Sequence, residues 1–252
     1  MKKILFMTAV VSIGILFVVS ASMATPINPV GGGGAELSLQ AVLNSITTAP
    51  ISGTSSVNVN TDQVSPDAYW SIGGSGLSGI TMIIELAGWN ASTTFGVFSG
   101  NNAVQIFGGG ASQGAQAVMS IKADGSVWVN GSDTLVDFPG NLFGYYIKTI
   151  GQQNAIFYSD TSKNVDQFDH MVAFQGKGID TIQIPTLVPG LWGVSEFALA
   201  FEDTIYGGDW DYQDLVVMVE SVNPAVPEPA TMLLLGSGLL GLAGFARKKF
   251  KK

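Results

Sequence analysis

Residues 197–221 read FALAFEDTIYGGDWDYQDLVVMVES, with two apolar runs on either side of an acidic turn. The runs FALAFE (197–202) and LVVMVES (215–221) are short and contain the aromatic and branched residues that are typical of β-strands. Gly207 and Gly208 lie between them, where a turn needs conformational freedom. This stretch therefore predicts two strands joined by an acidic turn.

Similar short runs follow one another through the chain, separated by Gly, Asn or Asp. Their spacing of 8–15 residues and the scarcity of helical windows predict an all-β fold, an antiparallel β-sandwich or jelly-roll-like domain. Ala123-Asp124-Gly125 is a hairpin signal between two of the runs. The further predicted strands are ITMIIEL (80–86), TFGVF (94–98), VQIF (104–107), AVMSIK (117–122), SVWVN (126–130), GYYIKTI (144–150), AIFY (155–158), MVAFQ (171–175) and DTIQI (180–184).

The chain divides into four predicted parts. Residues 1–24 form a signal peptide, and residues 25–67 form a leader with a short helix near 35–46 and a Ser/Thr/Asn-rich loop. Within that loop, VNVN (57–60) could form an edge strand. Residues 68–223 form the β-rich domain, and residues 224–252 form a membrane-directed tail. About 200 exported residues fit one β-rich domain.

The N-terminus has the organisation of a secretory signal peptide. Lys2 and Lys3 precede the apolar run ILFMTAVVSIGILFVV, and small residues up to Ala24 suit cleavage by signal peptidase after that residue. An uncleaved N-terminal anchor is the alternative interpretation. The short apolar run and its small-residue end favour cleavage.

The C-terminal tail has three successive parts, which begin with the tripeptide Pro227-Glu228-Pro229. Residues 230–246 are uncharged, and a helix of that length rises about 25 Å, near the thickness of a bilayer core. The basic cluster Arg247, Lys248 and Lys249 would stop transfer on the cytoplasmic side. The tail is therefore predicted to insert into the membrane as a transmembrane helix.

This order of parts closely resembles the PEP-CTERM sorting signal of Gram-negative bacteria. The resemblance implies that an exosortase recognises Pro227-Glu228-Pro229 and removes the tail. It also implies export across the inner membrane, transient membrane anchoring, and a final place at the cell surface or in the extracellular matrix.

The predicted exported part is strongly acidic. Between the two targeting segments lie eighteen acidic residues and four lysines, which gives a net charge near −14. Such a surface excludes nucleic-acid binding, which needs a basic footprint, and favours divalent cations. The chain has no cysteine, so it has no disulfide and cannot be a thiol enzyme.

The acidic turn is the main candidate site. Five like charges within thirteen residues are tolerable only in full solvent or around a cation. Alternation along an extended segment places Asp209 and Asp211 on one side, and Asp203 and Asp214 can approach from the strand ends. Carboxylate and carbonyl oxygens suit Ca²⁺. The predicted ligands are Asp209, Asp211, Asp214, Asp203 and Glu202, and a solvated acidic turn is the alternative.

A second oxygen-rich loop precedes the run at 171–175. Its candidate metal ligands are Asp160, Asn164, Asp166 and Asp169. Lys163 would partly neutralise this loop and weaken calcium binding. A loop held by hydrogen bonds is the alternative interpretation.

The stretch from Gly208 to Val217 fits the pattern G-D-x-D-x-x-D-L-V-V, which resembles the DUF4114 family of bacterial exported domains. Thr94-Phe95-Gly96-Val97, Phe143-Gly144-Tyr145-Tyr146 and Phe157-Tyr158-Ser159-Asp160 also resemble that family, over roughly residues 70–221. Trp210 departs from it, because a charged residue is more common there. The resemblance implies the fold of this domain and its export from the cell. Calcium binding is suspected for the family.

The sequence predicts a protein that is not an enzyme. His170 is the sole histidine, and no G-x-S-x-G nucleophile elbow is present. We therefore expect a non-catalytic, calcium-stabilised protein of the cell surface or exopolysaccharide matrix. A carbohydrate-binding module is an alternative, since the chain has five tryptophans. A secreted glycoside hydrolase also stays open, because its two carboxylates are defined by spatial separation.

We predict that replacing Pro227 and Pro229 together by Ala blocks removal of the tail in a host with a matching exosortase. The rigid, extended tripeptide is the feature that a protease would recognise. Intact-mass measurement should show that the unaltered protein loses residues 1–24 and the tail, and that the variant keeps the tail. Unchanged processing of the variant would contradict this prediction.

Overall fold

The computed structural model describes residues 37–85, 93–150 and 154–225. Within these ranges, no helix combines the length and the apolar character needed to cross a bilayer. The predicted signal peptide with its cleavage site at Ala24 lies outside the described residues. So do Pro227-Glu228-Pro229, the predicted transmembrane helix, and the basic residues Arg247, Lys248 and Lys249.

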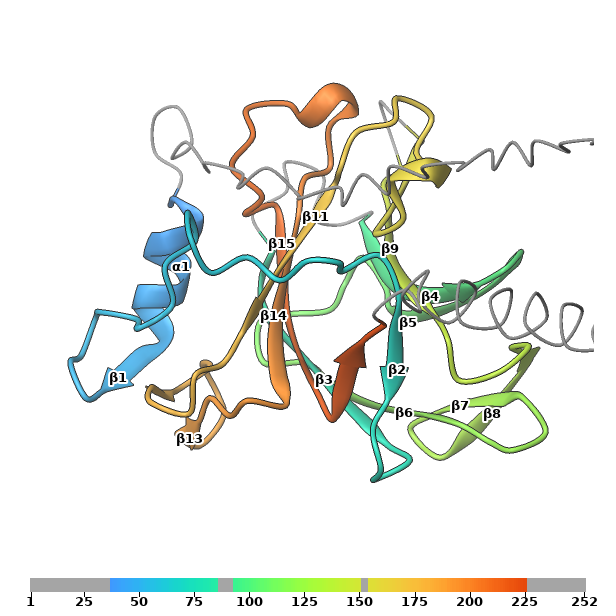
Figure 1. Cartoon of the computed structure of the whole chain (residues 1–252), viewed down its shortest axis with the longest axis horizontal. Helices are drawn as coiled ribbons and strands as arrows, with labels where there is room; N and C mark the ends of the chain where they lie inside the picture. Colours follow the sequence, from blue (N-terminus) through green and yellow to red (C-terminus); the bar gives the residue numbers. More distant parts are fainter. Residues whose placement is uncertain (1–36, 86–92, 151–153, 226–252) are drawn as a thin grey trace, which may run out of the picture.

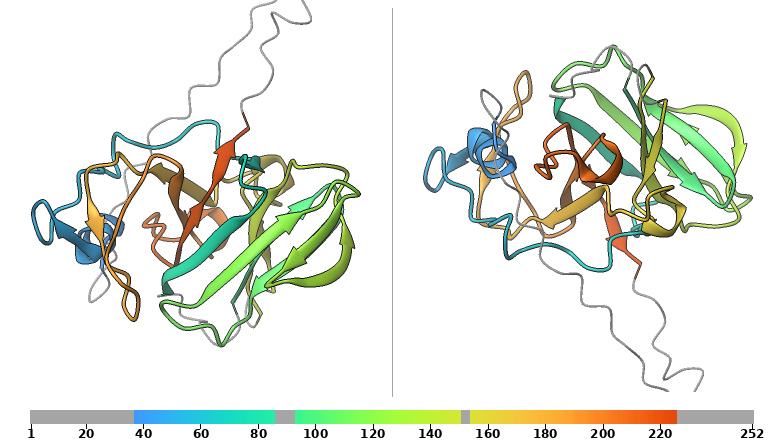
Figure 2. Two further views of the ribbon diagram at one scale, coloured as in Figure 1. Left: turned by 90° about the horizontal axis from the view of Figure 1, so that it is seen from below. Right: turned by 90° about the horizontal axis from the view of Figure 1, so that it is seen from above.

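Two antiparallel sheets face each other as a sandwich (Figures 1 and 2). The larger sheet contains β3 (Ser78–Glu85), β6 (Gln116–Ile121), β7 (Ser126–Val129), β8 (Ser132–Asp137), β11 (Met171–Gln175), β14 (Glu196–Phe201) and β15 (Leu215–Glu220). Its strand order is β11-β14-β15-β3-β6-β7-β8. The smaller sheet contains β4 (Thr94–Ser99), β5 (Asn102–Phe107), β9 (Gly144–Lys148) and β10 (Ile156–Tyr158), in the order β10-β9-β4-β5.

Shorter elements surround the sandwich. The remaining elements are α1 (Leu39–Ile46), β1 (Thr47–Ala49), β2 (Trp70–Ile72), η1 (Thr161–Lys163), β12 (Thr181–Ile182), β13 (Gly190–Leu191), η2 (Ile205–Gly207) and β16 (Val222–Pro224). The strands among them form a three-stranded sheet, β1-β12-β13, and the pair β16-β2. In both views of Figure 2, α1 and the smaller sheet lie on opposite sides of the strands near the C-terminus.

Strands β11, β14 and β15 are buried on both faces. Successive side chains of a strand point to opposite faces, and here each face meets its own hydrophobic cluster. Phe197, Leu199 and Phe201 of β14 belong to one cluster, whereas Ala198 and Ala200 belong to the other. This two-sided burial explains why these strands are continuous apolar runs in the sequence rather than alternating ones.

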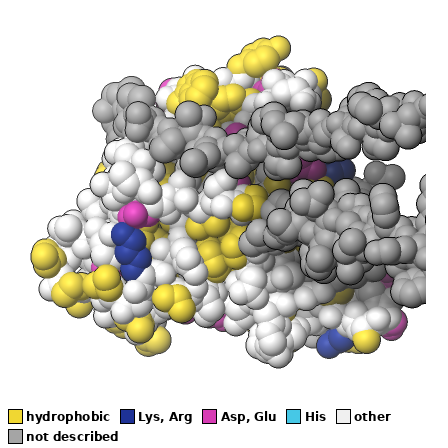
Figure 3. Space-filling model, in the orientation of Figure 1, with side chains coloured by type: hydrophobic (Ala, Val, Ile, Leu, Met, Phe, Trp, Pro, Cys, Tyr) yellow, Lys and Arg dark blue, Asp and Glu magenta, His cyan; other side chains and the backbone are white. Residues whose placement is uncertain are grey.

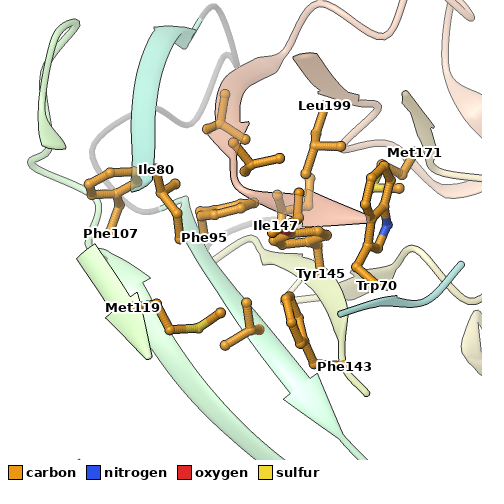
Figure 4. Close-up of a cluster of buried hydrophobic side chains, with 14 of the residues drawn as sticks. Trp70, Ile80, Phe95, Phe107, Met119, Phe143, Tyr145, Ile147, Met171 and Leu199 are labelled. Carbon is orange, nitrogen blue, oxygen red and sulfur yellow. The ribbon is translucent and has the colours of Figure 1, made fainter. Parts of the chain in front are cut away.

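The cluster between the two sheets is rich in aromatic rings (Figure 4). Trp70 packs edge-on against Phe197 with 4.9 Å between ring centroids, and Phe95 stacks on Tyr145 at 5.8 Å. Gly96 is needed here, because a Cβ at this position would collide with the Tyr146 ring and the Val104 carbonyl. Close packing of these rings fixes the distance between the sheets.

Helix α1 covers the outer face of the larger sheet (Figure 1). Leu39, Val42, Leu43 and Ile46 recur at helical spacing, and all four are buried. The Ser38 hydroxyl caps the first turn by accepting a hydrogen bond from the Ala41 N–H at 3.2 Å. The helix therefore contributes to the second cluster together with Ile83, Val172, Phe174, Trp192 and Val216.

The predicted β-sandwich is confirmed, and all of the quoted strand runs contain observed strands. The hairpin at Ala123-Asp124-Gly125 is also confirmed, since it joins the paired strands β6 and β7, and Gly125 has φ +96°. The sequence missed β1, β2, β8, β13 and β16, which are short or largely polar. VNVN (57–60) is not a strand, although Val57 and Val59 are buried in the second cluster.

We predict that Leu43→Ala lowers the free energy of unfolding by about 2–5 kcal/mol, as expected for a fully buried leucine. Leu135→Ala is the matched control, because Leu135 is 89% exposed and should change stability by less than about 0.5 kcal/mol. Urea unfolding of residues 25–225 measures both. Equal effects would show that α1 is not part of the folded core.

Candidate metal centre

The acidic turn forms the connection between β14 and β15, at one end of the larger sheet. Phe201 and Leu215 are the last paired residues of these strands, and residues 202–214 loop out beyond them. Glu202 and Asp203 directly follow β14, and Asp214 directly precedes β15. Three carboxylates of the loop are thus attached to the rigid ends of two buried strands.

The loop brings its five carboxylates together in two overlapping sets. Oxygens of Glu202, Asp209 and Asp211 all lie within 4.8 Å of one another. Oxygens of Glu202, Asp203 and Asp214 do the same. Glu202 belongs to both sets. All five residues that the sequence identified as primary ligands therefore contribute to one acidic cluster.

Several of these carboxylates are buried. Glu202 is 1% exposed, Asp203 4% and Asp211 1%. One oxygen of Glu202, Oε2, and one of Asp203, Oδ2, are buried without a hydrogen-bond partner. A buried polar atom without a partner has a substantial desolvation cost, so these two oxygens are candidates for binding a cation.

The other contacts hold the cluster in shape. The Asp203 N–H donates to Asp214 Oδ2 at 2.9 Å, and the Thr204 N–H donates to Glu202 Oε1 at 3.2 Å. The Gln213 side-chain amide donates to Asp211 Oδ2 at 2.7 Å. The two ion pairs of the described residues, His170–Asp166 and Lys177–Asp62, involve none of the five clustered carboxylates.

The crowding of these carboxyl groups raises their pKa values. Burial, and next the charges of neighbouring carboxylates, raise the pKa of Glu202 to about 9 and that of Asp214 to about 8. The pKa of Asp203 is also raised, chiefly by burial. Without a cation, the cluster would hold protons near neutral pH, and a divalent cation would replace them.

The backbone of the acidic loop contains several residues in strained, left-handed conformations. Tyr206, Trp210 and Tyr212 have φ of +62°, +63° and +53°, which is costly for residues with a side chain. Gly207 and Gly208 also have positive φ. A Cβ on Gly207 would collide with the Phe168 ring, and one on Gly208 would lie 2.6 Å from Glu202 Oε1. Both glycines allow the loop to fold back over Glu202.

The neighbouring loop, residues 160–170, supports the acidic loop from one side. Asp166 Oδ2 accepts the Tyr206 N–H at 2.7 Å and lies 3.0 Å from His170 Nε2. His170 Nδ1 lies 2.9 Å from the Glu202 carbonyl oxygen, and its ring is fully buried. His170 therefore connects the two loops and has no exposed nitrogen for acid–base chemistry.

The four secondary candidate residues lie in hydrogen bonds of the 160–170 loop. Asp160 caps η1 through Ser162 and accepts the Tyr69 hydroxyl at 2.7 Å. The Asn164 side chain binds the Tyr158 and Phe168 backbones, and Asp169 accepts from the Met171 N–H at 3.4 Å. None of the three aspartates belongs to a metal-sized set of the described residues. These contacts favour the hydrogen-bonded loop over a second metal site.

Sequence reasoning missed a carboxylate near these loops, Asp67. Burial, and next the charge of Asp169, raise the pKa of Asp67 well above its usual range. The pKa of Asp169 is raised to about 6 by burial. Because the two residues are far apart in the chain, no local pattern could have found this pair.

Residues 225–248 match the family model of the PEP-CTERM protein-sorting motif. The chain carries a PEP-CTERM sorting signal. This signal indicates that the protein is exported, is held transiently in the membrane, and is processed by an exosortase on its way to the cell surface.

A second family model, the domain of unknown function DUF4114, matches residues 137–222 of the chain. The matched stretch contains β9 to β15, and so both the 160–170 loop and the acidic loop. No curated protein and no solved structure matches the chain. Neither family description names a catalytic activity.

We predict that the calcium-free protein becomes less stable as the pH rises from about 5 to about 9. Glu202 and Asp214 have a higher pKa in the folded state than in the unfolded state, where it is about 4. The folded state therefore keeps protons that unfolding releases, and this contribution disappears as the pH passes the folded pKa. Thermal melts in chelator at pH 6 and pH 8.5 measure the effect.

Glu202→Gln serves as the control for this titration, because it removes the carboxyl whose pKa is raised to about 9 and should flatten the pH dependence. A midpoint that rises from pH 6 to pH 8.5 in chelator would contradict the prediction.

Proposed function

We propose that this protein is a non-catalytic component of the cell surface or exopolysaccharide matrix, whose exported domain is stabilised by calcium bound to residues 202–214. The observation that supports this proposal is the pair of buried, unpartnered oxygens, Glu202 Oε2 and Asp203 Oδ2, inside a cluster of five carboxylates. A buried set of like charges needs a cation close by to remain ionised.

The donor set favours calcium over other metals. Every carboxylate ligand is an oxygen donor, which suits hard cations, and calcium accepts six to eight oxygens with flexible geometry. The chain has no cysteine, and both nitrogens of its sole histidine face protein oxygens, so zinc or copper ligands are missing from the cluster. Mg²⁺ demands a near-ideal octahedron, which an irregular loop supplies poorly.

Bound calcium would stabilise the fold in two ways. It would neutralise repulsion at the ends of β14 and β15, and it would fix a loop of thirteen residues whose backbone is strained. Extracellular calcium modules bind at about 0.1–1 mM, and a ligand at 100 times its dissociation constant adds about 2.7 kcal/mol. That is a large contribution for a domain without disulfides.

The surface around the cluster supports a second candidate function, a calcium-dependent carbohydrate-binding module. Tyr206 is 72% exposed and Trp210 47% exposed, and both belong to the acidic loop. The Trp210 ring packs edge-on against Phe168 at 4.6 Å, which holds it in place. Figure 3 shows hydrophobic side chains at the top of the molecule, where Figure 1 draws this loop. Exposed, fixed aromatic rings beside a cation suit the stacking of a sugar ring.

We predict that calcium raises the thermal midpoint of residues 25–225 relative to chelator, and that Asp209→Asn with Asp211→Asn removes most of this rise. The physical reason is the loss of two ligands from the same set. Asp133→Asn with Asp137→Asn is the matched control, because both carboxylates are exposed on β8. An unchanged midpoint in calcium would show that the acidic loop is only solvated surface.

For the second candidate function, we expect Trp210→Ala to abolish calcium-dependent retention on matrix polysaccharide while the calcium-induced rise in midpoint persists. Trp128→Ala is the control, since Trp128 lies on β7, away from the loop. Affinity electrophoresis in polysaccharide gels, with calcium and with chelator, measures retention. If the unaltered protein is not retained in either condition, this candidate function is wrong.

A further inference from the structure

A cavity of about 130 Å³ lies between the larger sheet and the hairpin formed by β12 and β13. Its floor is the outer face of the sheet, at β3, β14 and β15. The cavity lies at the end of β14 and β15 that is opposite to the acidic loop. Its wall is aliphatic and is formed by Ile182, Ile184, Leu187, Val188 and Leu191.

Two carboxylates, Glu196 and Glu220, line the same cavity. They are direct cross-strand partners, at the first residue of β14 and the last residue of β15. A Cβ on Gly79 would collide with the Glu220 side chain, so this side chain lies over the backbone of β3. Like charges directly opposite each other destabilise an antiparallel pair of strands. The cavity therefore contains a local excess of negative charge.

Neither glutamate forms an ion pair within the described residues. The ion pairs there are His170–Asp166 and Lys177–Asp62, and none of the described residues that line the cavity is basic. Glu196 Oε2 accepts the Gly193 N–H at 2.8 Å. Burial chiefly, and also the charge of Glu220, raise the pKa of Glu196. A cation between the two carboxylates would relieve their repulsion.

The cavity thus combines an aliphatic wall with two adjacent carboxylates. A lysine side chain has the complementary structure, because a flexible aliphatic stem carries an ammonium group with only hydrogen-bond donors. We propose that this cavity binds a lysine side chain of a partner protein, with the stem against the aliphatic wall and the ammonium group between Glu196 and Glu220. The net charge near −14 of the exported part also favours a basic partner. The inference does not depend on calcium.

The hairpin leaves the cavity accessible to such a side chain. Val188 is 87% exposed and Leu191 57% exposed, so solvent reaches this wall. Gly190 lies between them, and a Cβ at this position would meet no atom within 4 Å. The backbone of a partner could therefore stay outside the cavity while its lysine stem packs against the hairpin, as lysine stems commonly do on apolar surfaces.

Saturation-transfer difference NMR tests the proposal with the full-length protein, purified in detergent, and the peptide acetyl-Ala-Lys-Ala-amide. A solution of 0.15 M NaCl screens weak surface attraction. We expect saturation transfer to the methylene protons of the lysine. The same peptide with norleucine, which keeps an aliphatic stem but has no ammonium group, should bind far more weakly. Glu196→Gln with Glu220→Gln should reduce the affinity for the lysine peptide at least about tenfold, because charge-assisted hydrogen bonds are lost.

Asp133→Asn with Asp137→Asn is the matched control, because it removes the same charge from exposed positions on β8 and should leave binding unchanged. Leu191→Ser tests the aliphatic wall at an exposed position and should weaken binding. Near-UV circular dichroism checks that each variant is folded. If the glutamine variant is not, the comparison of the two peptides on the unaltered protein decides the question.

Four results would overturn the inference: no binding of the lysine peptide, equal binding of the norleucine peptide, unchanged binding by the folded glutamine variant, or an equal loss in the control variant. Binding of free 1,5-diaminopentane without binding of the lysine peptide would also overturn it, because the ligand would then be a small amine and not a protein. None of these results bears on the proposed function, since the acidic loop takes no part in the cavity.

Discussion

The burial of β11, β14 and β15 on both faces is the constraint on which the rest of the structure depends. On one face these strands contact the aromatic cluster between the sheets, and on the other they contact α1 and the residues that follow it. A strand between two packed layers cannot shift its register without exposing one set of side chains and burying another. The ends of β14 and β15 are thereby fixed relative to each other.

This rigidity explains how a cluster of like charges can persist in the fold. Glu202, Asp203 and Asp214 are attached directly to the fixed strand ends, so the core keeps them together despite their repulsion. The strained residues Tyr206 and Trp210 are held by the neighbouring loop, through Asp166 and Phe168. The stability of the hydrophobic core thus offsets the charge repulsion and backbone strain of the acidic loop. Such local strain is common at functional sites.

The 160–170 loop shows how similar residues can have different roles. Its aspartates resemble those of the acidic loop in type and spacing, yet its side-chain oxygens accept N–H and O–H groups of their own and neighbouring segments. In the acidic loop, by contrast, two buried oxygens of Glu202 and Asp203 have no partner. The number of available hydrogen-bond donors distinguishes a structural loop from a candidate cation site, and composition cannot reveal it.

Local signals let the sequence by itself determine the β-rich class, most of the strands, the hairpin at Ala123-Asp124-Gly125, the acidic loop, and the sorting signal that the family match confirms. Each of these depends on neighbours within a few residues, through side-chain alternation, turn chemistry or the order of a short motif. The strand β8 escaped notice because half of its side chains are polar and exposed.

Only the tertiary structure decided how distant segments meet. It decided that α1 belongs to the core and that Asp67 lies near Asp169. It also decided that the acidic loop forms two sets that share Glu202. These features depend on the packing of strands from all parts of the chain, because contacts across a sheet fix side-chain distances that no local pattern contains.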